Sequence, residues 1–227
     1  MNNGRDEFPH SVLLAGASGL VGRELLAQLL AGESTTVHAL LRREVPDLPV
    51  SRHLKRHVID FAQPGPLPTA DTVYIALGTT LKTAGSKAAF RAVDLDAVVA
   101  VARAARQAGV QRAAVVSAMG ADIGSHVFYS RIKGEMEAQL AALGFARLVL
   151  ARPSLLAGGR ARLGQPPRWG EQLALMLFEP LGGLLPARVR PIDAAVVARA
   201  MCVAVRRDGP AVQIIESAEL HTIGGTP

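Results

Sequence analysis

The sequence predicts an α/β protein in three layers, with a doubly wound, mostly parallel sheet of about six or seven strands between helices. Short apolar runs alternate with longer helical patterns, the order that builds parallel β-α-β units. A glycine-rich turn joins the first strand to the first helix, where a doubly wound sheet needs a tight turn. The length of 227 residues suits one domain with a substantial core.

Four apolar segments in the first third of the chain predict strands, at residues 11–16, 35–43, 56–61 and 71–78. The first and fourth are nearly continuous in apolar residues, which suits strands that are buried on both faces of a sheet. Between the first two strands, residues 19–32 repeat apolar side chains with helical period and end in glycine. This pattern predicts the first helix.

The middle of the chain continues the alternation. A long helix rich in alanine and valine is predicted from Ser86 to Gly109, followed by a strand at 112–120. A helix at 128–144 and a strand at 146–154, which Pro153 ends, complete a core at 11–156.

The rhythm changes after Pro153. Glycines and prolines predict a loop, followed by a helix at 169–180, whose apolar residues would form a lid or core. A short strand, a helix capped by Asp193 and a last strand at 211–217 follow. We find no internal repeat and expect a single domain, residues 1–227, in which residues 157–227 form a small cap.

Composition excludes several classes of function. The net charge of +6 comes from dispersed basic residues and the aromatic content is 4%, so we expect no nucleic-acid partner. No segment resembles a signal peptide or a membrane span. His53 and His57 lack the companions of a metal site, so no metal is expected. The single cysteine, Cys202, favours a buried thiol, and we expect a cytoplasmic location.

The motif GASGLVG, residues 16–22, indicates a dinucleotide-binding turn. Its first glycine can make the tight turn, the second lets the backbone approach a pyrophosphate, and the third allows close helix packing. The helix N-terminus then offers free N–H groups to the phosphates. The residues predicted to hold the pyrophosphate are Gly16, Ala17, Ser18, Gly19, Leu20, Val21 and Gly22.

The end of the second strand favours NADP over NAD. An NAD-binding protein usually has an acidic residue here for the ribose 2′-hydroxyl, but this strand ends in Arg42 and Arg43. Arginine matches a 2′-phosphate bidentately. The alternative is that both arginines are solvated and Glu44 reaches the ribose.

Two further strand ends are expected near the cofactor, because ligands lie at the carboxyl ends of parallel strands. Asp60, after the third strand, is placed to meet the adenine amino group. The segment after the fourth strand should run beside the adenosine ribose; its residues are Leu77, Gly78, Thr79 and Thr80. For the two threonines, ordinary loop hydroxyls are an equal alternative.

Three residues predict a proton-transfer site. Tyr129 and Lys133 are four apart on a helix and so share one face, and Ser117 ends the preceding strand. A phenol is a poor acid–base catalyst at neutral pH unless a cation such as lysine stabilises its anion. The serine would hydrogen-bond and orient a substrate oxygen.

Together with the glycine motif, these residues resemble the short-chain dehydrogenase/reductase superfamily in its atypical, shorter branch. The segments ALGTT, FRAVDLDAV, VVSAMGAD, FYSRIKGEMEAQL and ARPSLL are similar to the Tat-interacting-protein-type oxidoreductases and their bacterial relatives. The resemblance implies a Rossmann fold, NADPH binding and the Ser117, Tyr129 and Lys133 roles above. It also implies that backbone near the nicotinamide comes from Arg152, Pro153 and Leu155.

Two departures from the family pattern stand out. Asp94 lies near the place where many relatives carry a catalytic-site asparagine, which puts a proton relay through that position in doubt. The chain also lacks the large substrate domain of sugar-nucleotide epimerases.

We therefore expect an NADP-dependent oxidoreductase acting on a small carbonyl or alcohol, as a monomer or homodimer. Two alternatives remain: an NADPH-sensing regulatory protein with a protein partner, and an epimerase or isomerase with tightly bound NAD.

Overall fold

The computed structural model describes residues 11–32, 35–157 and 190–225. Its strands and helices are β1 Ser11–Ala15, α1 Leu20–Leu30, β2 Thr36–Leu41, β3 Leu54–Val58, β4 Thr72–Ile75, α2 Leu81–Ala84, α3 Lys87–Arg91, the π-helical η1 Ala92–Ala97, α4 Val98–Gln107, β5 Arg112–Val116, α5 Phe128–Ala141, β6 Arg147–Arg152, β7 Leu156–Ala157, β8 Ile192–Asp193, α7 Ala194–Arg206, β9 Val212–Glu216 and α8 Ser217–Gly224.

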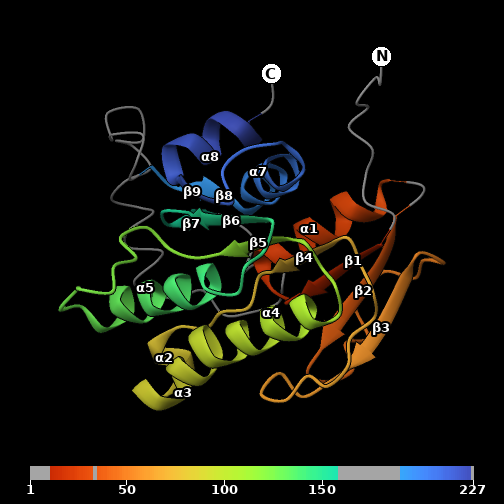
Figure 1. Cartoon of the computed structure of the whole chain (residues 1–227), viewed down its shortest axis with the longest axis horizontal. Coiled ribbons are helices and arrows are strands. Elements are labelled where there is room, and N and C mark those ends of the chain that lie inside the picture. Colours follow the sequence, from red (N-terminus) through yellow and green to blue (C-terminus); the bar gives the residue numbers. More distant parts are fainter. Residues whose placement is uncertain (1–10, 33–34, 158–189, 226–227) are drawn as a thin grey trace.

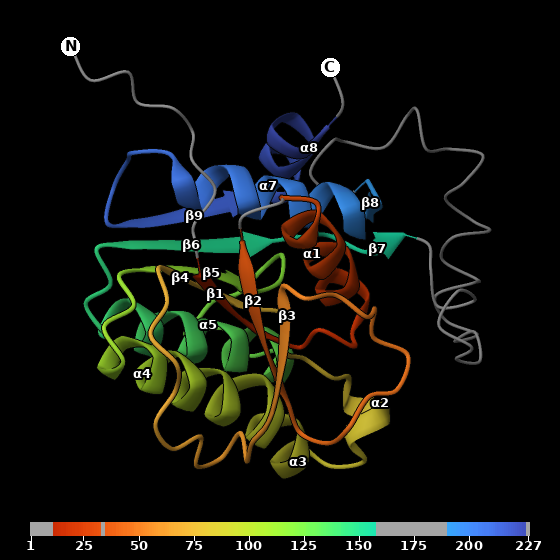
Figure 2. The same ribbon diagram turned by 90° about the vertical axis from the view of Figure 1, so that its right-hand side faces the viewer.

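Seven strands form one parallel sheet in the order β3-β2-β1-β4-β5-β6-β9. Helices α1, α7 and α8 cover one face, and α3, η1, α4 and α5 cover the other (Figures 1 and 2). The three-layer, doubly wound α/β fold expected from the sequence is confirmed. Since every strand is parallel, all seven carboxyl ends lie along one edge of the sheet.

Alternation along the strands fills both cores. In β1, Val12 and Leu14 face the helices α1 and α7, whereas Leu13 and Ala15 face α4. All four are fully buried, which explains why this strand reads as a continuous apolar run. The same alternation in β5 and β6 leads Ser117, two residues after Val115, toward the face that α5 covers.

Most predicted elements lie where the sequence indicates, with shorter strands and one irregular helix, but the strand expected at 56–61 is Leu54–Val58. The strand expected at 71–78 contains only Thr72–Ile75, so residues 76–80 form a loop at the carboxyl edge. The long helix expected from Ser86 to Gly109 includes a π-helical turn at Ala92–Ala97. The spacing of apolar residues does not predict such a π-helical turn. Turns of this kind are often found at functional sites.

Residues after 190 do more than cover the sheet edge. The predicted strand at 211–217 joins the main sheet as β9, parallel to β6, and α7 and α8 pack on the sheet face beside it. Asp193 caps α7 as expected, its Oδ1 accepting from the Ala195 N–H at 2.8 Å. The helix expected at 169–180 lies outside the described residues.

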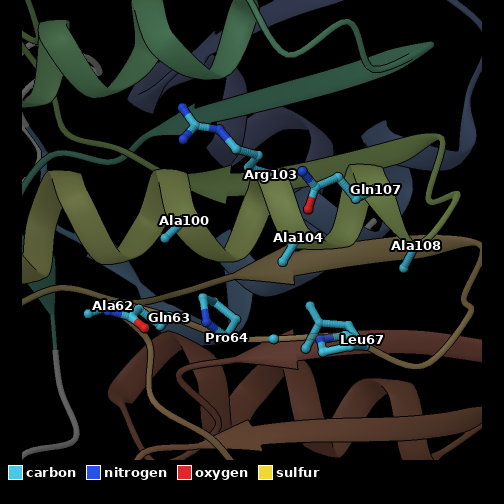
Figure 3. A pocket seen from close by; sticks show the side chains of 11 residues that line it. Ala62, Gln63, Pro64, Leu67, Ala100, Arg103, Ala104, Gln107 and Ala108 are labelled. Carbon is cyan, nitrogen blue, oxygen red and sulfur yellow. The ribbon is translucent and has the colours of Figure 1, made fainter.

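The connection from β3 to β4 is a proline-rich loop, without a described helix. It leaves a groove of about 680 Å³ against α4, toward which Ala100, Ala104 and Ala108 point (Figure 3). The residues that line this groove include none of the predicted catalytic or cofactor positions. The groove is therefore separate from the site built at the carboxyl edge.

Two histidines join the edge strand β3 to β2. The Nδ1 of His38 and the Nε2 of His57 lie 2.9 Å apart, and the rings stack. One ring must donate and the other accept, so the contact fails when both are protonated. Burial lowers the pKa of both histidines, and the charge of nearby Lys55 adds to this effect.

We expect the free energy of unfolding to fall as the pH drops below about 6.5, the pKa of a histidine in an unfolded chain. As the pH falls, His38 and His57 take up protons at a higher pH in the unfolded chain than in the folded protein. Protonation therefore favours unfolding. Urea titrations across this pH range measure the loss. His57→Gln should reduce it, whereas His126→Gln, which removes an exposed histidine, should leave it. An unchanged pH dependence in His57→Gln would contradict this explanation.

Candidate functional site

Predicted site residues follow the carboxyl ends of five neighbouring strands. The glycine motif follows β1, Arg42 and Arg43 follow β2, and Asp60 lies just beyond β3. Loop 76–80 follows β4 and Ser117 follows β5. Parallel strand order thus brings segments that are far apart in sequence to one edge of the sheet.

The glycine motif forms a turn that tolerates no side chains at two of its positions. Gly16 has a φ of 93°, and a Cβ there would lie 2.5 Å from the carbonyl oxygen of Ala76. A Cβ on Gly22 would lie 1.9 Å from the carbonyl oxygen of Gly16. Gly19 is the N-cap of α1 and has no side chain to cap the helix. The turn therefore leaves bare backbone at a helix N-terminus, which fits a dinucleotide pyrophosphate.

The strand ends that were predicted to meet the adenosine carry exposed charges. Arg42 and Arg43 are exposed where β2 ends, which leaves them accessible to a ligand phosphate. Asp60 is also exposed, and its Oδ1 accepts from the Ala62 N–H at 2.9 Å. Thr80 serves as the N-cap of α2, its hydroxyl accepting from the Thr83 N–H at 3.2 Å. One oxygen of Asp60 and the Thr80 hydroxyl thus have local structural partners.

Asp94 and Lys133 form a buried ion pair. The Nζ of Lys133 lies 2.7 Å from Oδ1 of Asp94, and side-chain exposure is 4% and 1% respectively. The other carboxylate oxygen of Asp94 accepts from the Thr79 N–H at 2.7 Å. A Cβ on Gly78 would lie 3.4 Å from Oδ1. The π-helical turn therefore places Asp94 between the loop after β4 and helix α5.

Tyr129 lies beside this ion pair. Burial raises the pKa of the Tyr129 phenol; the positive charge of Lys133 opposes this rise, and the negative charge of Asp94 adds to it. The ring also packs at 5.6 Å, centroid to centroid, from Phe90. Lys133 is thus close enough to influence the phenol, as the i, i+4 spacing predicts, but Asp94 counters its charge.

Ser117 contacts a residue that the sequence analysis missed. Its Oγ lies 2.5 Å from Oε1 of Glu137, and both side chains are buried. Arg152 places Nε at 2.9 Å from the same oxygen and Nη2 at 2.6 Å from Oε2. Its Nη1 reaches Glu216 at 2.9 Å. Hydrogen bonding to Glu137 is the largest cause that raises the pKa of Arg152.

Spacing could have identified Glu137. It lies four residues after Lys133 and eight after Tyr129, so the three share one face of α5. The side chain of Arg152, predicted only for its backbone, completes this cluster. The backbone carbonyls of Pro153 and Leu155, which were also predicted to lie near the nicotinamide, already have hydrogen-bond partners within the protein. The Pro153 carbonyl accepts from the Met119 N–H, and the Leu155 carbonyl accepts from the Ile192 N–H.

Residues 11–32, 35–157 and 190–225 contain no group of three or more His, Cys, Asp or Glu side chains able to hold a metal ion. None of the helices in these ranges has the length and apolar character needed to cross a membrane.

Arg152→Met should lower the free energy of unfolding by about 3 kcal/mol, because it leaves the buried Glu137 carboxylate without its cation. Urea denaturation measures the change. Glu216→Gln is the matched control: this partner of Arg152 has 51% exposure, and its loss should cost less than about 1 kcal/mol. Equal losses in the two variants would contradict the importance of the buried pair.

Comparisons with known proteins agree with this geometry. A family described as NAD(P)H-binding matches residues 16–154. Protein FMP52, mitochondrial, of Eremothecium gossypii is 32% identical over 225 residues, 94% of this chain and 96% of the relative. The structure of MoeE5 in complex with UDP-glucose and NAD has a TM-score of 0.66 at 21% identity, covering 94% of this chain and 80% of that one. UDP-glucose 4-epimerase of Thermotoga maritima has a TM-score of 0.67 at 14% identity, covering 92% and 77%.

These comparisons correct the expected location. The cytoplasmic prediction is wrong, because the curated FMP52 relatives are named as mitochondrial proteins. The prediction depended on a single cysteine and on the lack of a recognisable targeting segment. Neither property distinguishes the cytoplasm from the interior of an organelle.

Proposed function

Because the chain belongs to the NAD(P)H-binding family and to the atypical short-chain dehydrogenases/reductases, we propose that it is an NADP-dependent oxidoreductase acting on a small carbonyl or alcohol. The observation that carries the proposal is the placement of Tyr129 and Lys133 on α5, beside Asp94 and next to the strand end that positions Ser117. The bare glycine turn at the same sheet edge supports the dinucleotide.

In the proposed arrangement the pyrophosphate lies on the turn from Gly16 to Gly22, and Arg42 and Arg43 hold the 2′-phosphate. Bound NADPH supplies the hydride. Tyr129 gives its proton to the substrate oxygen, and Ser117 accepts a hydrogen bond from the hydroxyl that forms. Lys133 stabilises the tyrosinate left behind, to the extent that Asp94 leaves its charge available.

A second candidate function is NADPH sensing without turnover. The Asp94–Lys133 ion pair favours it, since a carboxylate beside the lysine opposes ionisation of Tyr129. Tight NADPH binding, a protein partner whose affinity depends on the bound dinucleotide, and no hydride transfer would distinguish it from an oxidoreductase. An epimerase with retained NAD is a third possibility, which identifying the dinucleotide that co-purifies would test.

The double variant Arg42→Ala, Arg43→Ala should weaken NADPH binding by about tenfold or more and leave NADH binding nearly unchanged, because only NADPH carries the 2′-phosphate. Titration calorimetry with both dinucleotides measures the two affinities. Arg103→Ala, which removes an exposed arginine from α4, is the matched control. Equal NADPH and NADH affinities in the wild-type protein would refute the proposed preference.

Asp94→Asn should lower the pKa of Tyr129, because it removes the negative charge that raises this pKa and leaves Lys133 unopposed. Ultraviolet titration of tyrosinate should show an ionisation step at lower pH than in the wild type. Oxidation of an alcohol, which needs the tyrosinate as its base, should extend to lower pH in parallel.

Two variants control this titration. Tyr129→Phe identifies the step, since the other tyrosine, Tyr74, is fully buried and its pKa is raised well above the usual value. Asp96→Asn changes an exposed carboxylate two residues away that pairs with Arg91 at 3.7 Å. A step that does not move in Asp94→Asn would show that this carboxylate does not govern the phenol.

A further inference from the structure

Glu137 accepts three hydrogen bonds in the interior of the site. Two come from Arg152, at 2.9 and 2.6 Å, and the third links it to Ser117 at 2.5 Å. A carboxylate has no hydrogen to give, so Ser117 is the donor in the third bond. The short distance is typical of a hydroxyl that donates to a charged oxygen.

The bond to Glu137 determines which hydrogen bonds Ser117 can still make. A hydroxyl group has one hydrogen and two acceptor positions, so a serine that donates to Glu137 can only accept from another group. The Ser117 backbone is also held, its N–H donating to the Ala151 carbonyl at 2.7 Å. We infer that Ser117 presents only acceptor positions to the ligand, and that the site therefore selects the hydroxyl of an alcohol over a carbonyl oxygen.

The inference rests on the proposed function, and it assigns Glu137 as a positioning residue for Ser117. Glu137 shares the α5 face of Tyr129 and Lys133, so one helix carries the acid–base pair and the partner of the serine. Arg152 holds both Glu137 oxygens and is itself held by Glu216. The Glu137 carboxylate is thus held at both of its oxygens.

Tyr129, the second proposed partner of the ligand oxygen, is a hydrogen-bond donor. Burial raises the pKa of Tyr129, so at neutral pH the phenol carries its proton and donates. An oxygen held between Tyr129 and Ser117 would accept from the first and donate to the second. An alcohol oxygen can do both, whereas a carbonyl oxygen can only accept.

The test uses cyclohexanol and cyclohexanone, which match in size, with the full chain. Cyclohexanol is titrated into NADPH-loaded protein and cyclohexanone into NADP⁺-loaded protein, pairings that do not allow hydride transfer. Ser117→Ala should weaken cyclohexanol binding by about fivefold, the value of one hydrogen bond, and weaken cyclohexanone by less than about twofold. Ser130→Ala, the same change one residue after Tyr129, should alter neither affinity.

Glu137→Gln tests the positioning role. A glutamine amide either donates to Ser117 or accepts from it only as a neutral group, so the serine hydrogen becomes available to a ligand carbonyl. The ratio of cyclohexanol to cyclohexanone affinity should fall about threefold or more. Glu135→Gln, on the same helix but paired with Arg91, should keep the wild-type ratio. A general loss of folding would weaken both probes and leave the ratio unchanged.

The outcomes separate this inference from the proposed function. Equal losses for the two probes in Ser117→Ala, or no cyclohexanol binding to loaded wild-type protein, would overturn the inference alone. Failure of both dinucleotides to bind would overturn the proposed function and the inference with it. An unchanged ratio in Glu137→Gln, in a variant that keeps the wild-type cyclohexanol affinity, would remove Glu137 from its role.

Discussion

The arrangement of this sheet edge depends on one buried carboxylate, Asp94. With 1% of its side chain exposed, it must be paired, and it meets that need with the Thr79 N–H and the Lys133 ammonium. The first contact fixes the loop after β4 and the second fixes helix α5. The π-helical turn brings the carboxylate to this position. One charge thus joins the loop after β4 to the helix that carries Tyr129, and it also reduces the effect of Lys133 on the phenol.

Local patterns in the sequence were sufficient to predict the strands, the glycine turn and the Tyr129–Lys133 pair. Each depends on neighbours within a few residues: alternation of apolar side chains, a turn that excludes a Cβ at Gly22, or an i, i+4 spacing. The contacts that the sequence analysis missed are long-range. Nothing near Ser117 indicates that its hydroxyl meets Glu137, and nothing near Asp94 indicates that a π-helical turn directs it to Lys133. These pairs form only when strands and helices have packed.

The pair of Glu137 and Arg152 is costly to bury and contributes little to stability as a whole, because desolvation offsets the attraction between its charges. Its effect is to fix the orientation of the Ser117 hydroxyl. Two N–H groups of one planar guanidinium fix both Glu137 oxygens, and the carboxylate in turn fixes Ser117. A fully satisfied network of this kind holds a hydroxyl group in one orientation, which a purely apolar core could not do.

Charge is therefore distributed unevenly along the sheet edge. At the Tyr129 end, Lys133 is neutralised by Asp94, and Arg152 by Glu137 and Glu216, so these two cations leave no net positive charge for an anionic substrate. At the other end, Arg42 and Arg43 are exposed where β2 ends. The proposed dinucleotide, with its 2′-phosphate toward the arginines, and a neutral hydroxyl compound at Ser117 match this distribution. The basic residues behind the net charge of +6 are therefore unequally available: the two arginines at the end of β2 are exposed, whereas Lys133 and Arg152 are paired with carboxylates.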